Sequence, residues 1–346
     1  MKYVHTTIPH SKVNNSQFYF QDREMSVKWH GCRSVPRKIN GGGPQGATIG
    51  LLEYLSQSND NSDCVSESER FKFLDDLSIL EIVNLLTIGI SSFNLKYQIP
   101  SDIPQHNQFI PPENLKSQIW LDEINKWTIN QKMMVNEKKT KTMIFNCTDK
   151  YQFTTRLTMN EKPIEVINST RLLGTILTDD LKWDSNCANL VKKANGRMEI
   201  LRKVASFGLN RDELKNIYFL FVRSVLEQSS TVWHSSLTME NREDLERVQK
   251  SAVRLIMGAS YKGYKKSLDI LEMENLNERR EALCLNFAIK ATKHPQMRKM
   301  FPVRNKTHDM TTREEEKFIV QHANTERLRK SSIIYMQNML NKHEIK

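Results

Sequence analysis

The stretch that decides the fold reads R-F-K-F-L-D-D-L-S-I-L and occupies residues 70–80. Its apolar residues alternate with polar ones on both sides of Asp75 and Asp76, a period typical of two strands joined by a tight turn. Two adjacent carboxylates beside apolar strands repel each other, and keeping both ionised is costly unless they share a cation. The stretch therefore predicts a β-hairpin that holds a divalent metal ion. Asp-Asp is also good turn chemistry on a solvated hairpin tip, so that reading stays open.

Further motifs flank this hairpin. Residues 41–46 read G-G-G-P-Q-G, residues 136–146 read N-E-K-K-T-K-T-M-I-F-N, residues 171–177 read R-L-L-G-T-I-L and residues 323–328 read A-N-T-E-R-L. With F-L-D-D at residues 73–76, these segments resemble, in the same order, motifs of the reverse transcriptases of non-LTR (LINE, jockey-like) retrotransposons. The matching motifs there are the Pro-Gln-Gly turn, the aromatic-x-Asp-Asp signature, the Asn-x-x-Lys-Thr segment, the strand and turn that grip the primer, and the C-terminal helix. The resemblance extends from about residue 41 to the end of the chain.

This resemblance implies an α+β fold, in which an incomplete polymerase palm of antiparallel hairpins and helices precedes an all-α thumb and C-terminal helices. The implied bounds are residues 1–182 for the partial palm, 183–294 for the helical thumb and 295–346 for the C-terminal helical extension. The implied activity is that of an RNA-directed DNA polymerase, a nucleotidyltransferase. In the family, the first catalytic aspartate lies on a palm strand upstream of the matching region. We therefore expect a fragment of the enzyme that is catalytically incomplete.

The same resemblance implies the site residues. Asp75 and Asp76 are expected to be catalytic and to bind Mg²⁺ or Mn²⁺, because paired metal ions stabilise the attacking and leaving oxygens of phosphoryl transfer. The residues expected to shape the nucleotide pocket are Gly43, Pro44, Gln45 and Gly46. The residues expected to contact the RNA template or DNA primer are Lys141, Leu173, Gly174, Lys192, Lys193 and Arg197. A plain helix-entry turn and ordinary surface solvation are the respective alternatives.

The charge of the chain agrees with a polyanionic partner. Its 346 residues carry a formal net charge of +11, which suits nucleic acid or an acidic membrane surface. No apolar run reaches the roughly eighteen residues that span a bilayer, and the N-terminus lacks a signal-peptide pattern. We therefore expect an intracellular protein of the cytoplasm or nucleus, with no membrane partner. The five cysteines are scattered and are interpreted as free thiols.

Apolar periodicity and capping residues predict the remaining elements. Before the last β region, a helix over residues 115–135 leads into a strand over 142–146. The β region itself should contain a hairpin whose four-residue turn is 160–163. The acidic pair at Asp179 and Asp180 is not nominated as catalytic and is interpreted as a cap for the next helix.

The remainder is predicted to be helical. A basic helix over 186–206 ends at a glycine, Gly208. Later helices are expected over residues 211–233, 242–257, 276–293 and 312–341. In the W-H-S-S-L stretch that starts at Trp233, the tryptophan is expected in the core and His234 is expected to be its polar neighbour rather than a ligand.

Three functions stay open on the sequence alone. The first is a reverse transcriptase fragment, and the second is a noncatalytic, basic nucleic-acid-binding protein derived from such an element. The third is a helical protein whose charge is ordinary surface and that has no nucleic-acid role.

Overall fold

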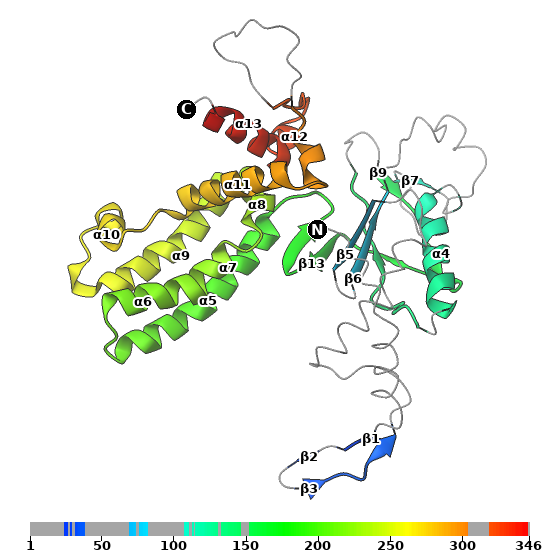
Figure 1. The fold of residues 1–346 in the computed structure, drawn as a ribbon, viewed down its shortest axis with the longest axis horizontal. Coiled ribbons are helices and arrows are strands. Elements are labelled where there is room, and N and C mark those ends of the chain that lie inside the picture. The colour runs from blue at the N-terminus through cyan, green and yellow to red at the C-terminus, as the bar shows by residue number, and fades with distance from the viewer. Residues whose placement is uncertain are drawn as a thin grey trace, which may run out of the picture. The chain divides into compact units, whose positions relative to one another are not determined.

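The structure is a computed structural model that describes residues 24–26, 28–29, 32–38, 69–73, 76–81, 107–110, 113, 115–130, 133–146, 152–303 and 318–344. The chain divides into two compact units, Met1–Val166 and Ile167–Lys346. Short strands and helix α4 (Lys116–Asn130) make up the described part of the first unit, whereas helices dominate the second (Figure 1). The fold is therefore of the mixed α+β class that the sequence predicts.

The hairpin predicted at residues 70–80 is confirmed in the first unit. Strands β5 (Glu69–Phe73) and β6 (Asp76–Leu80) pair antiparallel, with Phe73 opposite Asp76. Leu77 and Ile79, on one face of β6, pack against the buried side chains Trp120 and Ile124 of α4. The period of two in the sequence thus placed the apolar face of the hairpin correctly.

The residue that follows strand β6, Glu81, caps the start of helix α4. The carboxylate of Glu81 accepts hydrogen bonds from the backbone N–H groups of Lys116 (3.0 Å) and Ser117 (2.8 Å). These are first-turn donors without a partner inside the helix, and the positive end of the helix dipole favours a carboxylate there. The predicted helix over 115–135 is confirmed, although it ends at Asn130.

The turn predicted at residues 160–163 is wrong in length. Strands β10 (Thr158–Met159) and β11 (Lys162–Pro163) leave only Asn160 and Glu161 in the connection, with φ of 50° and 64°. Two consecutive left-handed residues match the twist of a tight hairpin, so Lys162 and Pro163 belong to a strand.

Other strands of the first unit are short. Lys141–Thr142 forms β8, which pairs in parallel with β12 (Glu165–Val166), so the strand expected over 142–146 is shorter and starts earlier. Three further pairs join β1 (Glu24–Met25) to β4 (Arg37–Lys38), β2 (Lys28–Trp29) to β3 (Cys32–Arg33), and β7 (Asn107–Phe109) to β9 (Gln152–Thr154).

The second unit opens with a hairpin and continues with helices. Strands β13 (Ser169–Leu172) and β14 (Thr175–Thr178) precede the long helix α5 (Asp184–Ser206). The later elements are α6 (Arg211–Ile217), the π-helix η3 (Tyr218–Arg223), α7 (Ser224–Leu226), α8 (Ser230–Trp233), η4 (His234–Ser236), α9 (Met239–Met257), η5 (Gly258–Ser260), α10 (Tyr264–Leu271), α11 (Leu276–Lys293), η6 (Met297–Met300), α12 (Glu326–Arg329) and α13 (Ser332–Glu344).

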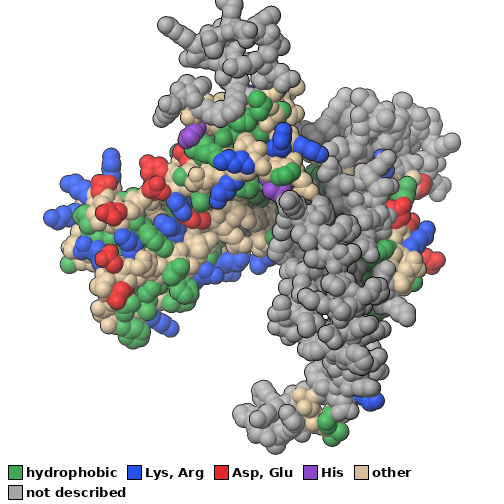
Figure 2. Space-filling model, in the orientation of Figure 1, with side chains coloured by type: hydrophobic (Ala, Val, Ile, Leu, Met, Phe, Trp, Pro, Cys, Tyr) green, Lys and Arg blue, Asp and Glu red, His purple; other side chains and the backbone are tan. Residues whose placement is uncertain are grey.

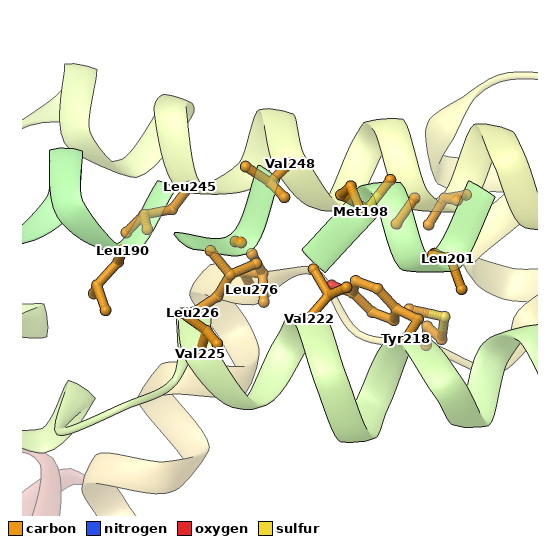
Figure 3. Packing of buried hydrophobic residues seen from close by; sticks show 14 of the residues in the cluster. Leu190, Met198, Leu201, Tyr218, Val222, Val225, Leu226, Leu245, Val248 and Leu276 are labelled. Atoms are coloured by element: carbon orange, nitrogen blue, oxygen red, sulfur yellow. The ribbon is translucent and has the colours of Figure 1, made fainter. Parts of the chain in front are cut away.

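A single apolar stripe of α5 builds the core of this unit. The stripe packs against α9 and against η3 and α7, and Leu276 at the start of α11 belongs to the same buried cluster. Figure 3 shows these side chains pointing toward one another between the helices: Leu190, Met198, Leu201, Tyr218, Val222, Val225, Leu226, Leu245, Val248 and Leu276. The helices predicted over 186–206, 242–257 and 276–293 are therefore confirmed. A second cluster links α11 to α13.

Two predicted helices are interrupted. The one expected over 211–233 passes through η3 and breaks at Ser229, whose φ is 53°. The one expected over 312–341 is wrong as a single element, because Phe318 forms a β-bridge with Val303. The Asn341 side chain also occupies both backbone groups of Phe318, with bonds of 2.9 and 3.0 Å, and this pairing replaces helical hydrogen bonds.

Asp180 does not cap α5. Its carboxylate accepts from the Thr178 hydroxyl (2.7 Å) and the Lys182 N–H (3.0 Å), and the pKa of the group is lowered by these bonds in spite of partial desolvation. The residue that caps α5 is Trp183, which forms no side-chain capping bond. Asp180 instead closes the turn that leads into the helix.

The capping box at the start of α6 gives a stability test. The Asn210 side chain accepts from the Glu213 N–H (3.0 Å), while the Glu213 carboxylate accepts from the Asn210 N–H (2.9 Å). Asn210→Ala should lower the free energy of unfolding in urea by about 1 kcal/mol. The control, Asn216→Ala on an exposed position of the same helix, should change it by less than about 0.5 kcal/mol. Equal losses in both variants would argue against the cap.

Candidate nucleic-acid-binding site

Several nominated residues lie outside the described part of the chain. These are Gly43, Pro44, Gln45 and Gly46 of the expected nucleotide pocket, and Asp75 of the expected metal site. Their roles stay predictions.

Asp76 is the first residue of strand β6 and pairs with Phe73 of β5. Within the described residues, no three His, Cys, Asp or Glu side chains gather into a group that could hold a metal ion. Because the described residues leave out Asp75, metal binding at Asp75 and Asp76 also stays a prediction.

Lys141 has a partner within the first unit. It lies on β8, and its ammonium group forms an ion pair with Glu165 on the paired strand β12. Both side chains are partly exposed, so the pair is worth little and can exchange for another anion. A contact from Lys141 to a phosphate would have to displace this carboxylate.

Leu173 and Gly174 form the two-residue turn between β13 and β14. Their φ values are 47° and 86°, and the strands close directly around them because Leu172 pairs with Thr175. A Cβ on Gly174 would lie 2.4 Å from Nε2 of Gln228, the end of a flexible side chain that can move away, so the φ of 86° is the reason for a glycine there. Leu173 is left-handed because a tight two-residue hairpin takes positive φ at both turn positions, and its side chain is 52% exposed. The leucine therefore offers apolar surface at the tip of the hairpin.

The hairpin is fixed to α5 by side chains of the helix. Asn186 accepts a hydrogen bond from the N–H of Ile176 (3.0 Å), and the Asn189 side chain lies 3.5 Å from the guanidinium of Arg171. Lys192 and Lys193 follow Asn189 by three and four residues, and residues at these spacings share a face of a helix. The hairpin turn and the two lysines therefore belong to one region of the second unit.

The basic residues of α5 differ in their engagement. Arg197 donates from Nη1 to the carbonyl of Phe221 (2.7 Å), which lies inside the π-helix η3. Arg202 pairs with Glu199 on the same helix. Lys192 is exposed and Lys193 is half-buried, and neither has an ion pair with a described carboxylate. Of the nominated α5 residues, the two lysines are thus better placed than Arg197 to meet a phosphate.

Sequence reasoning missed the role of Arg280. Its side chain is fully buried, its Nε donates to Nδ1 of His234 (3.3 Å), and its guanidinium carbon lies 5.9 Å from the centre of the Trp233 ring. Burial, reinforced by the charge of Arg280, lowers the pKa of His234 to about 3. Trp233 is a core residue as predicted, and Nδ1 of His234 accepts a hydrogen bond within the same packing.

The comparisons with known proteins give no identification. No known protein family, no curated protein and no solved structure matches this chain. Separately, no helix among the described residues is long and apolar enough to cross a membrane. The resemblance to retrotransposon reverse transcriptases rests on the sequence motifs alone.

The neutral state of His234 makes stability depend on pH. Its pKa is near 3 in the folded protein and about 6.5 when unfolded, so its contribution is complete above pH 6.5 and is lost as the pH falls toward 3. Between pH 7.5 and 5.0, His234→Gln should reduce the drop in unfolding free energy by about 2 kcal/mol relative to wild type. His322→Gln, at an exposed position, should leave the drop unchanged. If the unfolding free energy of His234→Gln fell as much as that of wild type, the pKa of His234 in the folded protein would lie near its unfolded value of about 6.5.

Proposed function

We propose that this chain is part of an RNA-directed DNA polymerase of the non-LTR retrotransposon type, and that its second unit binds the primer–template duplex as a thumb. The observation that carries the proposal is the joint placement of the Leu173–Gly174 turn and the lysines Lys192 and Lys193, which the bonds of α5 to the hairpin bring into one region. The first unit, with the Asp75–Asp76 hairpin, would be part of the palm.

The chemistry of this region suits a nucleic-acid backbone. Lysine ammonium groups neutralise phosphates without reading sequence, and such contacts position a protein on a duplex. Leu172 and Leu173 are 40% and 52% exposed and offer apolar surface beside those charges. Because the Gly174 turn lies against Gln228 and α5 is held by the core, these groups keep fixed positions relative to one another. Pre-organised contacts lose less entropy when a ligand binds.

The catalytic part of the proposal concerns Asp75 and Asp76. Carboxylates are ligands that Mg²⁺ prefers, and bound metal ions would stabilise the charge that develops during phosphoryl transfer. The two residues supply about −2 of charge against about +4 for two ions, so polymerisation would require a further carboxylate besides this pair. In this proposal the hairpin would support the two carboxylates, because strand β6 begins at Asp76 and packs against α4 through Leu77 and Ile79.

A noncatalytic nucleic-acid-binding protein is the second candidate. It is favoured by the fact that the hairpin turn, Lys192 and Lys193 all belong to the second unit, whose core forms without the Asp75–Asp76 hairpin. Binding by this unit alone does not need metal chemistry. The two candidates therefore make the same prediction for the lysines and different predictions for Asp75.

The lysine contacts are tested by the salt dependence of binding. In fluorescence anisotropy with a labelled RNA–DNA hybrid, Lys192→Gln/Lys193→Gln should reduce the slope of log K against log[salt] by about 2, close to 0.9 for each lost phosphate contact. The matched control is Lys290→Gln/Lys293→Gln, which removes the same charge from exposed positions of α11. An unchanged slope in the α5 variant, or equal changes in both, would exclude these contacts.

Metal binding separates the two candidates. In calorimetric titration with Mn²⁺, Asp75→Asn should bind several-fold more weakly than wild type, because a carboxylate ligand is lost. Asp269→Asn, at an exposed position of α10, should bind as wild type does. Identical titrations of Asp75→Asn and wild type would favour the noncatalytic protein.

A further inference from the structure

A second group of cations lies on helix α9, on helix α10 and in the connection between them. Residues 247–268 read R-V-Q-K-S-A-V-R-L-I-M-G-A-S-Y-K-G-Y-K-K-S-L and contain no Asp or Glu. Arg247 pairs with Asp244 one turn earlier (2.9 Å). The five other cations form what we call the α9–α10 basic surface, and all five are exposed: Lys250, Arg254, Lys262, Lys265 and Lys266.

Two tyrosines bring these cations to one surface. Nζ of Lys250 lies 5.6 Å from the centre of the Tyr264 ring, and the guanidinium carbon of Arg254 lies 5.3 Å from that of Tyr261. The rings come from the connection and the first turn of α10, whereas the cations come from α9. Lys262, Lys265 and Lys266 lie within two residues of these tyrosines in the sequence, so the rings join the α9 cations to the exposed segment that carries the other three. Figure 2 shows Lys and Arg side chains, with Asp and Glu side chains among them, at the end of the helical unit where α10 lies.

The nearest carboxylate of α9 is used elsewhere. Glu246 accepts from the Tyr264 hydroxyl and from the N–H of Leu276 (3.0 Å), and Nε2 of Gln249 donates to the same hydroxyl (2.9 Å). These bonds tie α10 and the start of α11 to α9. In the part of the chain that the structure describes, none of the five cations of the α9–α10 basic surface forms an ion pair with a carboxylate.

We propose that the α9–α10 basic surface binds the phosphate backbone of nucleic acid, as a contact separate from α5. A group of five exposed cations, none ion-paired among the described residues and with one exposed carboxylate, Asp269, on α10, attracts a polyanion, and a chain of phosphates offers repeated charges to several cations at once. The tyrosine rings restrain Lys250 and Arg254 in advance, which lowers the entropy lost on binding. No base-reading group is involved, so binding is independent of sequence.

An anionic membrane is the other polyanion to consider, and the surface does not suit it. Membrane-surface helices insert large apolar side chains below the headgroups. The apolar face of α9 faces the core with Leu245 and Val253, and Ile270, 52% exposed, is the one large apolar side chain that α10 exposes. A single exposed isoleucine is not the apolar face that a membrane-surface helix inserts, which favours phosphates that are reached from water.

The test uses the full chain and a labelled 20-base-pair duplex DNA, with anisotropy measured across a range of salt concentrations. Lys262→Gln/Lys265→Gln/Lys266→Gln should reduce the slope of log K against log[salt] by about 2 to 3. The matched control, Lys290→Gln/Lys293→Gln/Lys299→Gln, makes the same change in net charge at exposed positions and should keep the wild-type slope. Ser260→Lys, which adds a cation at an exposed position of η5, should increase the slope by about 1 and does not depend on the folding of the triple variant.

Each outcome decides the proposal. A smaller slope in the α9–α10 variant alone, with a larger one in Ser260→Lys, supports it. Equal changes in the variant and its control, or no change in either, overturn it, because binding then follows net charge or another surface. Loss of binding to phosphatidylserine vesicles with unchanged duplex binding also overturns it in favour of a membrane. The surface shares no residue with α5, so Lys192→Gln/Lys193→Gln measured in parallel shows separately whether the α5 contact fails.

Discussion

Burial of one stripe of α5 is the constraint on which the rest of the second unit depends. Leu190, Ala194, Met198 and Leu201 recur at helical spacing and are almost fully buried against α9, η3 and α7 (Figure 3). Burying one leucine side chain contributes about 1.5 to 3 kcal/mol, so the stripe outweighs any exposed ion pair of this helix. With this face fixed in the core, the cations of α5 can only occupy the remaining faces. The hydrophobic pattern thereby determines which charges meet solvent.

The same packing explains why basic residues of α5 are not equivalent. The π-helix η3 follows α6 on the opposite side of the core, and its Phe221 carbonyl accepts from Arg197. In a π-helix the backbone hydrogen bonds join residues five apart instead of four. The carbonyl of Phe221 accepts an additional hydrogen bond from Arg197, which lies outside η3. Arg197 thus helps to hold α5 to η3. Lys192 and Lys193 lie one turn after Asn189, whose side chain contacts Arg171 of the β13–β14 hairpin. Basic residues of α5 that the sequence does not distinguish therefore differ in the structure, because among the described residues some have hydrogen-bond or ion-pair partners and others do not.

Local signals predicted most of the fold, and long-range contacts account for the rest. Asn210, Asn275 and the apolar periods of α5, α9 and α11 were sufficient to place helices, because caps and stripes are local. The bridge at Phe318 depends on Val303 and Asn341, which are far along the chain, so no local pattern reveals it, and the sequence did not indicate the left-handed residue that breaks the helix at Ser229. For the site, the sequence indicated Gly174 and the lysines. It did not indicate the hydrogen bonds of Asn186 and Asn189 that join helix α5 to the β13–β14 hairpin. Helix α10 was missed because it has only eight residues, although Tyr264, Leu268 and Leu271 recur in it at helical spacing.

The central claim is that the second unit binds nucleic acid through Lys192 and Lys193, which lie on faces of helix α5 outside the core. The most direct measurement is lysine acetylation of the full chain, quantified by mass spectrometry with and without a saturating RNA–DNA hybrid. The account predicts that acetylation of Lys192 and Lys193 slows several-fold in the complex, while that of Lys290 and Lys293 on α11 does not change. Equal protection of all four lysines, or none at Lys192 and Lys193 when the hybrid is bound, would contradict it.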